Sequence, residues 1–262
     1  MKENKHRVFV CGDVHGSYDI KKLSTKNWKL QKELTKDDFL IFLGDFGNPW
    51  SCSVKDSVEV ITSWQDIIMS KDDKYWLDWV VAKRFTPLII LGNHEGLYSV
   101  WDKLPVTYYE PINGYVKELP LESGVVRFLL RDSEYTINGK RFLVIGGAMS
   151  TDKEYRIPDV SWWKLELLTI DEKNNILDLI AKDSEFDYVL SHTCPDIVVP
   201  FFTYGYSPKI NDPVSRFLGY VENMIEFKEW HFGHFHLDEV YVDGLNNHFQ
   251  CHYNSKPYEL IT

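Results

Sequence analysis

Short apolar runs recur along this chain, and glycine or polar residues follow each of them. Five runs are short enough to be single strands, at residues 8–11, 39–43, 88–91, 188–190 and 230–232. They consist almost entirely of apolar and aromatic residues, as expected for strands that are covered on both faces. In open α/β sheets, ligands bind outside the carboxyl ends of the strands. We therefore expect the polar segments behind the five runs to meet at one edge of a sheet.

The segments between these runs carry helical and hairpin patterns. Residues 55–84 place apolar side chains at helical spacing, which predicts two amphipathic helices with a break at residues 71–73. Three further strands are predicted at residues 125–130, 133–137 and 140–145. Asn138-Gly139 is a strong hairpin signal between the last two. We expect this meander to form a second sheet.

Two later helices are marked by their first residues. Thr169-x-x-Glu172 is a capping-box pattern that predicts a helix running to about residue 182. Asp212 followed by Pro213 predicts another helix, with Asp212 as its cap and proline at the first helical position. Residues 97–119 are interpreted as irregular, because prolines and a glycine interrupt them.

The composition is that of an ordinary α/β domain. The chain has 262 residues, and its 44% hydrophobic and 15% aromatic content can fill a sizeable core. It shows no repeat, low-complexity segment or linker, so we predict a single domain over residues 1–262.

Cysteine usage and the chain start favour the cytoplasm. The cysteines are scattered without a C-x-x-C spacing, which indicates reduced thiols and not disulfides or zinc ligands. No apolar stretch approaches the roughly 20 residues of a membrane helix. The first residues run straight into a strand, which leaves no room for a secretory signal. We expect a cytoplasmic protein with no membrane partner, and the oligomeric state is left open.

The polar segments behind the five runs hold candidate metal ligands. They are Gly12-Asp13-Val14-His15-Gly16, Gly44-Asp45, Gly92-Asn93-His94-Glu95, Ser191-His192 and Gly233-His234-Phe235-His236. Asp13 and His15 lie two residues apart, so they can face one cation only from extended or turn backbone, which the flanking glycines allow. We interpret the five segments as a two-metal hydrolytic site. A sixth junction, Gly146 to Asp152, is expected to reach the same edge.

In this order, each behind a strand, the motifs resemble the signature of the calcineurin-like metallophosphoesterases. The match runs from Asp13 to His236. Gly146-Gly147-Ala148 and Ser161-Trp162-Trp163 are also similar to segments of small bacterial and phage metallophosphatases. The resemblance implies an α/β fold, namely a four-layer αββα sandwich of two mixed sheets flanked by helices.

The resemblance also implies roles for the candidate residues. One metal would be held by Asp13, His15, Asp45 and His236, and the other by Asp45, Asn93, His192 and His234. These ligands suit manganese, iron, zinc, nickel or cobalt, and manganese is our first expectation. A hydroxide that bridges both metals would attack the phosphate, while His94 would act as general acid for the leaving oxygen. Glu95 is either a residue that orients a histidine or a turn residue.

Two further positions bear on this chemistry. Arg156 lies beyond the sixth junction, where its guanidinium would suit a phosphate by shape, although a surface arginine is the commoner outcome. Asn48 and Pro49 depart from the protein-phosphatase branch, which has there an Asp that orients the catalytic His and an Arg that grips phosphate. Phosphoprotein phosphatase activity of that type is therefore disfavoured, and the residue that orients His94 is left open.

The predicted function is metal-dependent hydrolysis of phosphate mono- or diesters. The alternative is a catalytically silent metal-binding scaffold, but silent relatives usually lose ligands, and here the expected ligands and His94 are all present. The net charge of −10 disfavours tight binding to a nucleic-acid backbone. Two divalent cations would restore about +4 locally, so this argument is not decisive. We favour a small phosphorylated substrate, with a nucleic-acid end or a phosphoprotein as alternatives.

Overall fold

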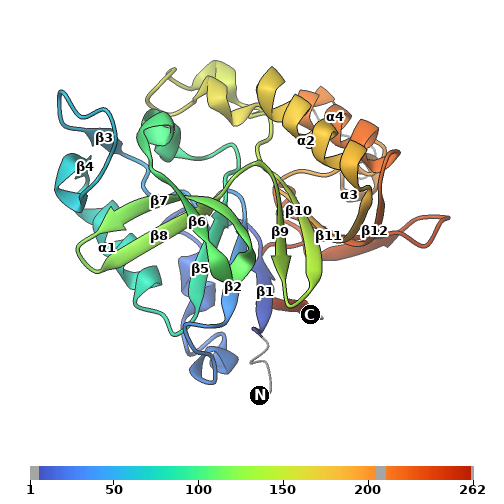
Figure 1. The fold of residues 1–262 in the computed structure, drawn as a ribbon, viewed down its shortest axis with the longest axis horizontal. Helices are drawn as coiled ribbons and strands as arrows, with labels where there is room; N and C mark the ends of the chain where they lie inside the picture. Colours follow the sequence, from blue (N-terminus) through green and yellow to red (C-terminus); the bar gives the residue numbers. More distant parts are fainter. Residues whose placement is uncertain (1–5, 204–210, 261–262) are drawn as a thin grey trace.

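Two sheets packed face to face, with helices outside them, make up the fold (Figure 1). The computed structural model describes residues 6–203 and 211–260. The first sheet has the strand order β15-β1-β2-β5-β8-β7-β6. Its strands are β1 (Val8–Cys11), β2 (Phe39–Leu43), β5 (Thr86–Ile90), β6 (Val106–Tyr109), β7 (Gly114–Leu121), β8 (Gly124–Leu129) and β15 (Tyr258–Leu260). Strands β1, β2, β5 and β8 are parallel, and the others pair antiparallel, so the sheet is mixed.

The second sheet is also mixed and has the order β13-β14-β12-β11-β10-β9. Its strands are β9 (Asp132–Ile137), β10 (Lys140–Ile145), β11 (Glu185–Ser191), β12 (Glu226–Phe232), β13 (Glu239–Val242) and β14 (His248–Cys251). A separate small hairpin joins β3 (Cys52–Val54) and β4 (Ile67–Met69).

Helices cover the outer faces of the sheets. The α-helices are α1 (Lys71–Val81), α2 (Ile170–Lys182), α3 (Val199–Phe202) and α4 (Pro213–Glu222). Short 3₁₀ helices span Ile20–Leu23, Lys29–Lys32, Trp64–Asp66, Gly96–Lys103, Glu110–Ile112, Lys153–Tyr155 and Lys164–Glu166. Within the described ranges, no helix combines the length and the apolar character needed to cross a membrane.

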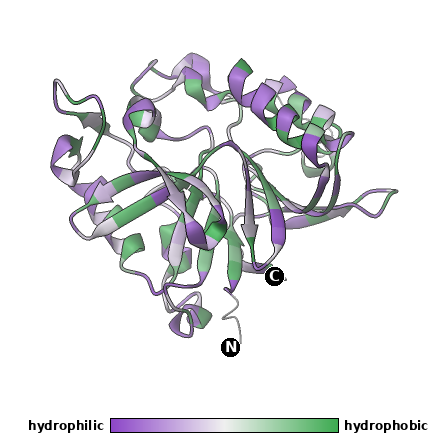
Figure 2. Ribbon diagram, viewed as in Figure 1, coloured by the Kyte–Doolittle hydropathy of each residue, from purple (hydrophilic) through white to green (hydrophobic). Residues whose placement is uncertain are grey.

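Alternation of side chains along the strands produces the layers. In β1, Val8 and Val10 point into the core between the sheets, while Phe9 points outward to the core beneath α1. In β11, Leu190 likewise joins the inter-sheet core, and Val189 packs beneath α2 and α4. Figure 2 shows hydrophobic residues along the central strands, with hydrophilic residues gathered in the loops and on the helices. The predicted αββα sandwich of two mixed sheets is confirmed.

The elements with the clearest local signals are also confirmed. All five strands that carry the motifs are present. Helix α2 begins with a complete capping box of Thr169 and Glu172, and the Asp212 side chain accepts the Val214 N–H at the start of α4. Asn138 and Gly139 both have positive φ, 52° and 75°, as a tight hairpin between β9 and β10 requires.

The prediction of two helices over residues 55–84 is wrong for the first of them. Residues 52–69 instead form the β3–β4 hairpin with a short 3₁₀ turn. The expected break is the start of α1, where the Ser70 hydroxyl accepts the Asp73 N–H. Acidic residues in a first helical turn are stabilised by the helix dipole, so Asp72 and Asp73 mark a beginning and not an interruption.

Two predictions about the sheets are also wrong. The meander does not form, because β8 pairs with β5 and β7 in the first sheet, while β9 and β10 form a hairpin in the second. Residues 97–119 are not irregular, since they contain β6, most of β7, one complete 3₁₀ helix and most of another. Pairing of β8 with the distant strand β5 decided the first outcome, and local pairing of β6 with β7 decided the second.

Candidate metal centre

The ends of five strands meet as the sequence predicts, but they do so where the two sheets come together and not at the edge of a single sheet. Strands β1, β2 and β5 deliver Asp13, Asp45 and Asn93 from the first sheet, and all three side chains are buried. Strands β11 and β12 deliver His192 and His234 from the second sheet, also buried. The centre is therefore built from both sheets.

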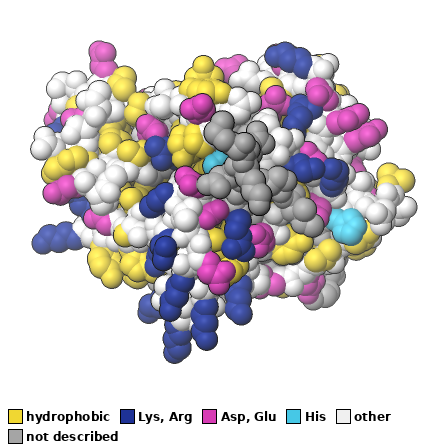
Figure 3. Space-filling model, turned by 60° about the horizontal axis from the view of Figure 1, so that its bottom comes forward, with side chains coloured by type: hydrophobic (Ala, Val, Ile, Leu, Met, Phe, Trp, Pro, Cys, Tyr) yellow, Lys and Arg dark blue, Asp and Glu magenta, His cyan; other side chains and the backbone are white. Residues whose placement is uncertain are grey.

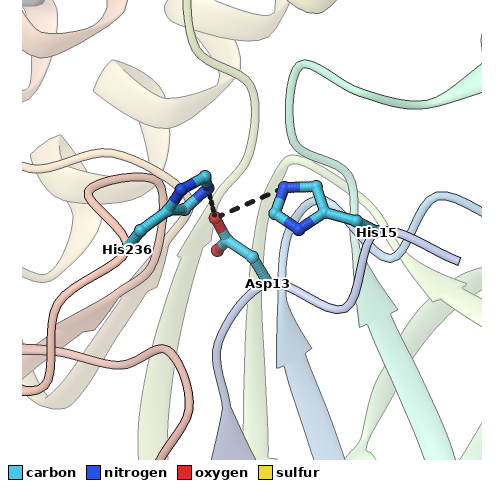
Figure 4. A group of neighbouring side chains, drawn as sticks. All are labelled: Asp13, His15 and His236. Carbon is cyan, nitrogen blue, oxygen red and sulfur yellow. Dashed lines mark ion pairs between the residues drawn. The ribbon is translucent and has the colours of Figure 1, made fainter. Parts of the chain in front are cut away.

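The first ligand cluster consists of Asp13, His15 and His236, whose ligand atoms lie within 4.8 Å of one another. Figure 4 shows the two imidazoles on either side of the Asp13 carboxylate. The Nε2 atom of His236 lies 3.2 Å from Asp13 Oδ2, and that of His15 lies 3.9 Å from the same oxygen. The His236 side chain is 50% exposed, whereas Asp13 is fully buried.

The second ligand cluster consists of Asp45, His192 and His234, all buried and also within 4.8 Å. The His192 Nε2 atom lies 3.2 Å from Asp45 Oδ1. On the other side of the ring, Nδ1 lies 2.8 Å from the Leu43 carbonyl, to which it donates. This bond fixes the ring and directs Nε2 into the cluster.

Asp45 lies between the two clusters. Its Oδ2 is 3.6 Å from His15 Nε2, while its Oδ1 faces His192. Oδ1 also accepts the backbone N–H groups of Asn93 and His94, each at 2.8 Å. One carboxylate oxygen is thus directed at each cluster.

The backbone of the centre is strained. His15, Asp45, His234 and His236 have φ values of 48°, 47°, 67° and 56°. Positive φ is uncommon for residues other than glycine, and such strain costs about 1–3 kcal/mol per residue and concentrates at functional sites. Close packing adds to this at Gly233, where a Cβ atom would lie 2.1 Å from Asp13 Oδ1.

The electrostatics of the centre fit bound cations. Burial raises the pKa of Asp45, but the charges of His192 and His94 outweigh it and hold that pKa well below its usual range. Burial lowers the pKa of His192 and His15, but Asp45 outweighs it and raises both to about 9. Two buried carboxylates therefore require positive charge between them. Divalent cations can replace the imidazolium protons in this role, since carboxylate and imidazole donors suit them.

Asn93 is oriented by Ser150 and, through it, by Glu166. Its Nδ2 donates to Ser150 Oγ at 3.1 Å, and Ser150 in turn donates its hydroxyl and its N–H to the two carboxylate oxygens of Glu166. The Asn93 Oδ1 atom is thereby turned toward His192 Nε2, 3.0 Å away. The junction after β10 reaches the centre through Ser150, as predicted, but no sequence signal marked Glu166.

Glu95 is a turn residue. Its carboxylate accepts the N–H groups of Phe46, Gly47 and Gly92 at 2.9–3.2 Å, so it ties the turn after β2 to the turn after β5. Burial, reinforced by Asp45, raises the pKa of Glu95 to about 8. The sequence left Glu95 either as a residue that orients a histidine or as a turn residue, and its contacts are those of a turn residue.

His94 lies beside the centre, with Nε2 4.0 Å from Asp45 Oδ2. Burial lowers the pKa of His94, against the opposing charge of Asp45, and the positive charge of Arg156 lowers it further. With its side-chain amide in the orientation that satisfies its neighbours, Asn48 donates N–H groups to Asp73 Oδ1 and to the Gly47 carbonyl. Position 48 thus supports a loop, and its contacts are directed toward α1.

Arg156 lines the same pocket as His94, but its guanidinium group already donates hydrogen bonds to protein acceptors. Its Nε and Nη2 atoms donate to the Asp152 carboxylate at 2.7 and 2.8 Å, and Nη1 donates to the Ser161 carbonyl. The arginine brings positive charge near His94 while its bidentate edge faces Asp152.

A pocket of about 790 Å³ opens on this centre. His15, His94, His236 and Arg156 line it together with the aromatic residues Tyr18, Trp50 and Tyr253. Asp72 and Asp73, from the first turn of α1, form another part of its wall.

Comparison with known proteins gives a family match. Residues 6–238 match the family described as calcineurin-like phosphoesterase. Phosphopantetheinyl hydrolase from Mycobacterium tuberculosis is a similar solved structure, with 13% identity, a TM-score of 0.46, and coverage of 98% of this chain and 96% of that one. GAP50, the anchor in the inner membrane complex of Plasmodium, has 11% identity, a TM-score of 0.44, and 97% and 77% coverage.

A third solved structure is the 5′-nucleotidase from Candida albicans, with 14% identity and a TM-score of 0.39. The alignment covers 97% of this chain but 47% of the nucleotidase, so this chain spans about half of that protein. No curated protein matches the sequence.

Proposed function

The chain belongs to the calcineurin-like phosphoesterase family and is a metal-dependent hydrolase of phosphoric esters, and from this premise we propose that it acts with two divalent cations on small phosphate mono- or diesters. The observation that carries the proposal is the position of Asp45, which directs one carboxylate oxygen toward each ligand cluster. A pair of cations, when bound, would polarise the phosphoryl oxygens and lower the pKa of a water molecule.

The residues that would hold the cations follow from the two clusters. Asp13, His15 and His236 would bind one cation, and His192, His234 and the Asn93 oxygen would bind the other, with Asp45 shared between them. Manganese remains our first expectation, since these donors accept several first-row metals.

His94 is proposed as the general acid. It lines the pocket beside the centre, and it belongs to neither ligand cluster. Its lowered pKa makes protonated His94 a stronger acid than an ordinary imidazolium. A bound phosphate anion would favour this protonated form. Arg156 would add positive charge for the phosphate, either from its present position or after leaving Asp152.

The pocket supports a small substrate. Its volume of about 790 Å³ lies in the range of pockets that enclose small molecules. Asp72 and Asp73 in its wall would repel additional phosphates, which disfavours polyphosphates and nucleic-acid backbone.

The test combines metal analysis with a series of leaving groups. We expect the purified protein to bind two divalent cations and to lose phosphoesterase activity on chelation. His94→Asn should keep both cations but nearly abolish hydrolysis of alkyl phosphates, because a poor leaving group needs the proton. Loss of general acid catalysis typically costs about 10²–10⁴-fold. Hydrolysis of p-nitrophenyl esters should fall much less, since nitrophenolate leaves as an anion.

The measurement is the slope of log rate against leaving-group pKa for both proteins, with metal content determined in parallel. Equal losses on alkyl and aryl esters would assign His94 to phosphate binding instead. A protein that binds cations but turns over no phosphate ester would support the silent scaffold.

A further inference from the structure

We propose that Lys22 and Tyr253 form a brace that positions the first ligand cluster and thereby sets its affinity for metal. This inference rests on the proposed two-cation site. It concerns residues that lie outside every motif of the sequence and outside both ligand clusters.

The Lys22 ammonium group is held by three backbone carbonyls. Its Nζ donates to the Gly12 carbonyl at 3.1 Å, to the Asp13 carbonyl at 2.5 Å and to the Tyr253 carbonyl. An ammonium group has three N–H donors, so each carbonyl takes one of them. Lys22 therefore has no donor left for a phosphate, and its charge serves the turn that carries Asp13.

The third carbonyl connects Lys22 to His236. The Tyr253 ring stacks on the His236 imidazole, with ring centroids 4.7 Å apart and an interplanar angle of 17°. Lys22 Nζ also lies 5.6 Å from the centroid of the Tyr253 ring. Because His236 is half exposed, this stacking supports a ring that the protein core leaves uncovered.

The segment that bears Tyr253 is itself anchored next to His236. The N–H groups of Tyr253, Asn254 and Ser255 donate to the carboxylate of Asp238, two residues beyond His236. The brace is thus a closed set of contacts: Lys22 holds the Asp13 turn and the Tyr253 carbonyl, and Tyr253 holds the His236 ring.

Lys22 is itself fixed by the fold. It lies in the 3₁₀ helix Ile20–Leu23, whose Ile20 and Leu23 side chains are fully buried. The position of the ammonium group therefore follows from core packing. The second ligand cluster is held differently, since His192 bonds the Leu43 carbonyl and Asn93 bonds Ser150. The Asp13 carboxylate also accepts the His234 N–H at 2.9 Å, so the brace should affect the first cation far more than the second.

The experiment measures Mn²⁺ binding by calorimetry in protein stripped with a chelator. His192→Ala is used to impair the second cluster and His236→Ala to impair the first, so that each background reports mainly one site. We expect Lys22→Met to weaken Mn²⁺ binding by about 10–100-fold in the His192→Ala background, the usual effect of losing a residue that supports metal ligands. In the His236→Ala background the same substitution should weaken binding far less, because Asp13 is linked to that site through a backbone N–H, that of His234.

Matched controls separate positioning from general stability. Lys21→Met removes an exposed neighbouring lysine and should not alter binding. Tyr253→Phe keeps the stacked ring and should bind as the parent does, whereas Tyr253→Leu should weaken the first site. The Tyr253 pair also decides the matter if Lys22→Met does not fold.

Unchanged affinity in Lys22→Met and Tyr253→Leu, or equal weakening in both backgrounds, would overturn the brace. Failure of the unsubstituted protein to bind two Mn²⁺ ions would instead contradict the proposed two-cation site.

Discussion

Asp45 has more roles in the centre than any other single residue described above. It is buried, its backbone has a positive φ, and its two oxygens face different ligand clusters. It also accepts the N–H groups that shape the Asn93-His94 turn. A change of one oxygen to an amide would therefore disturb metal binding and the turn together.

Asp45→Asn should be the most damaging ligand substitution. We expect the loss of at least one cation. The affinity for metal should fall by more than the factor of about 10–100 that is typical when a residue supporting a ligand is removed. Turnover should fall in parallel. Metal content by elemental analysis and turnover of p-nitrophenyl phosphate check this, with Asp56→Asn, which changes an exposed carboxylate outside the pocket, as control. Two retained cations and full turnover would contradict the shared-ligand assignment.

At the scale of elements, Asp73 joins α1 to the loop beyond β2. Its carboxylate accepts the N–H groups of Trp50 and Ser51 at 2.6 and 3.1 Å, and the Ser70 hydroxyl at 2.6 Å. Asp73 is buried, whereas Trp50 is partly exposed and Ser51 and Ser70 are exposed, so the carboxylate depends on these hydrogen bonds more than the donors do. The loop they belong to lines the pocket, so the start of α1 helps to shape the site.

Asp73→Ala should lower the free energy of unfolding by about 2–3 kcal/mol, because it removes three hydrogen bonds, each with a net contribution of about 1 kcal/mol. Asp72→Ala, in the same helical turn but exposed, should cost less than about 1 kcal/mol. Urea denaturation of both variants without added metal measures the difference. Similar losses would mean that the helix dipole, and not the link to the loop, sets the stability of this element.

At the scale of the whole molecule, a buried histidine pair couples stability to pH. His231 Nδ1 lies 2.9 Å from His252 Nε2, and His231 Nε2 lies 2.9 Å from Glu229. Burial lowers the pKa of His252 well below its ordinary value, and the positive charges of His231 and Lys22 lower it further. The folded protein therefore keeps His252 neutral.

Stability should fall as the pH drops below about 6.5, the ordinary pKa of histidine. In that window the unfolded chain binds a proton at His252 and the folded chain does not, so the loss approaches about 1.4 kcal/mol per pH unit until the folded pKa is reached. Urea unfolding of the parent and His252→Gln, from about pH 7.5 to pH 5, measures the difference in slope. Identical slopes would mean that His252 is protonated in the folded protein.

Surface charge bears on nucleic-acid binding at the same scale. Figure 3 shows Lys and Arg side chains gathered toward the lower edge of one face, with carboxylates spread over it. The net charge is −10. We expect binding to a short labelled DNA duplex at physiological salt to be no tighter than the about 10⁻⁴–10⁻⁶ M of nonspecific binding. Fluorescence anisotropy at low and physiological salt tests this, and salt-resistant submicromolar binding would move the substrate toward nucleic acid.

Much of the architecture and the centre could be predicted because the signals are local. A buried strand is read from its own apolar residues, the starts of α2 and α4 from Thr169 and Asp212, and the β9–β10 turn from Asn138-Gly139. The candidate ligands follow directly behind strands, and the ends of parallel strands share an edge, so the convergence within each sheet follows from chain order and sheet geometry. The meeting of the two groups of ligands depends on how the two sheets pack. The single-domain interpretation stays a prediction.

What only the tertiary structure decided depends on contacts between distant residues. The sheet to which β8 belongs is set by its pairing with β5 and β7, and the hairpin of β3 and β4 replaces a helix whose apolar spacing was present in the sequence. The engagement of Arg156 by Asp152 could not be chosen from residue type alone. Lys22 and Tyr253 are 231 residues apart, and no local pattern records a hydrogen bond that exists only after both sheets have packed.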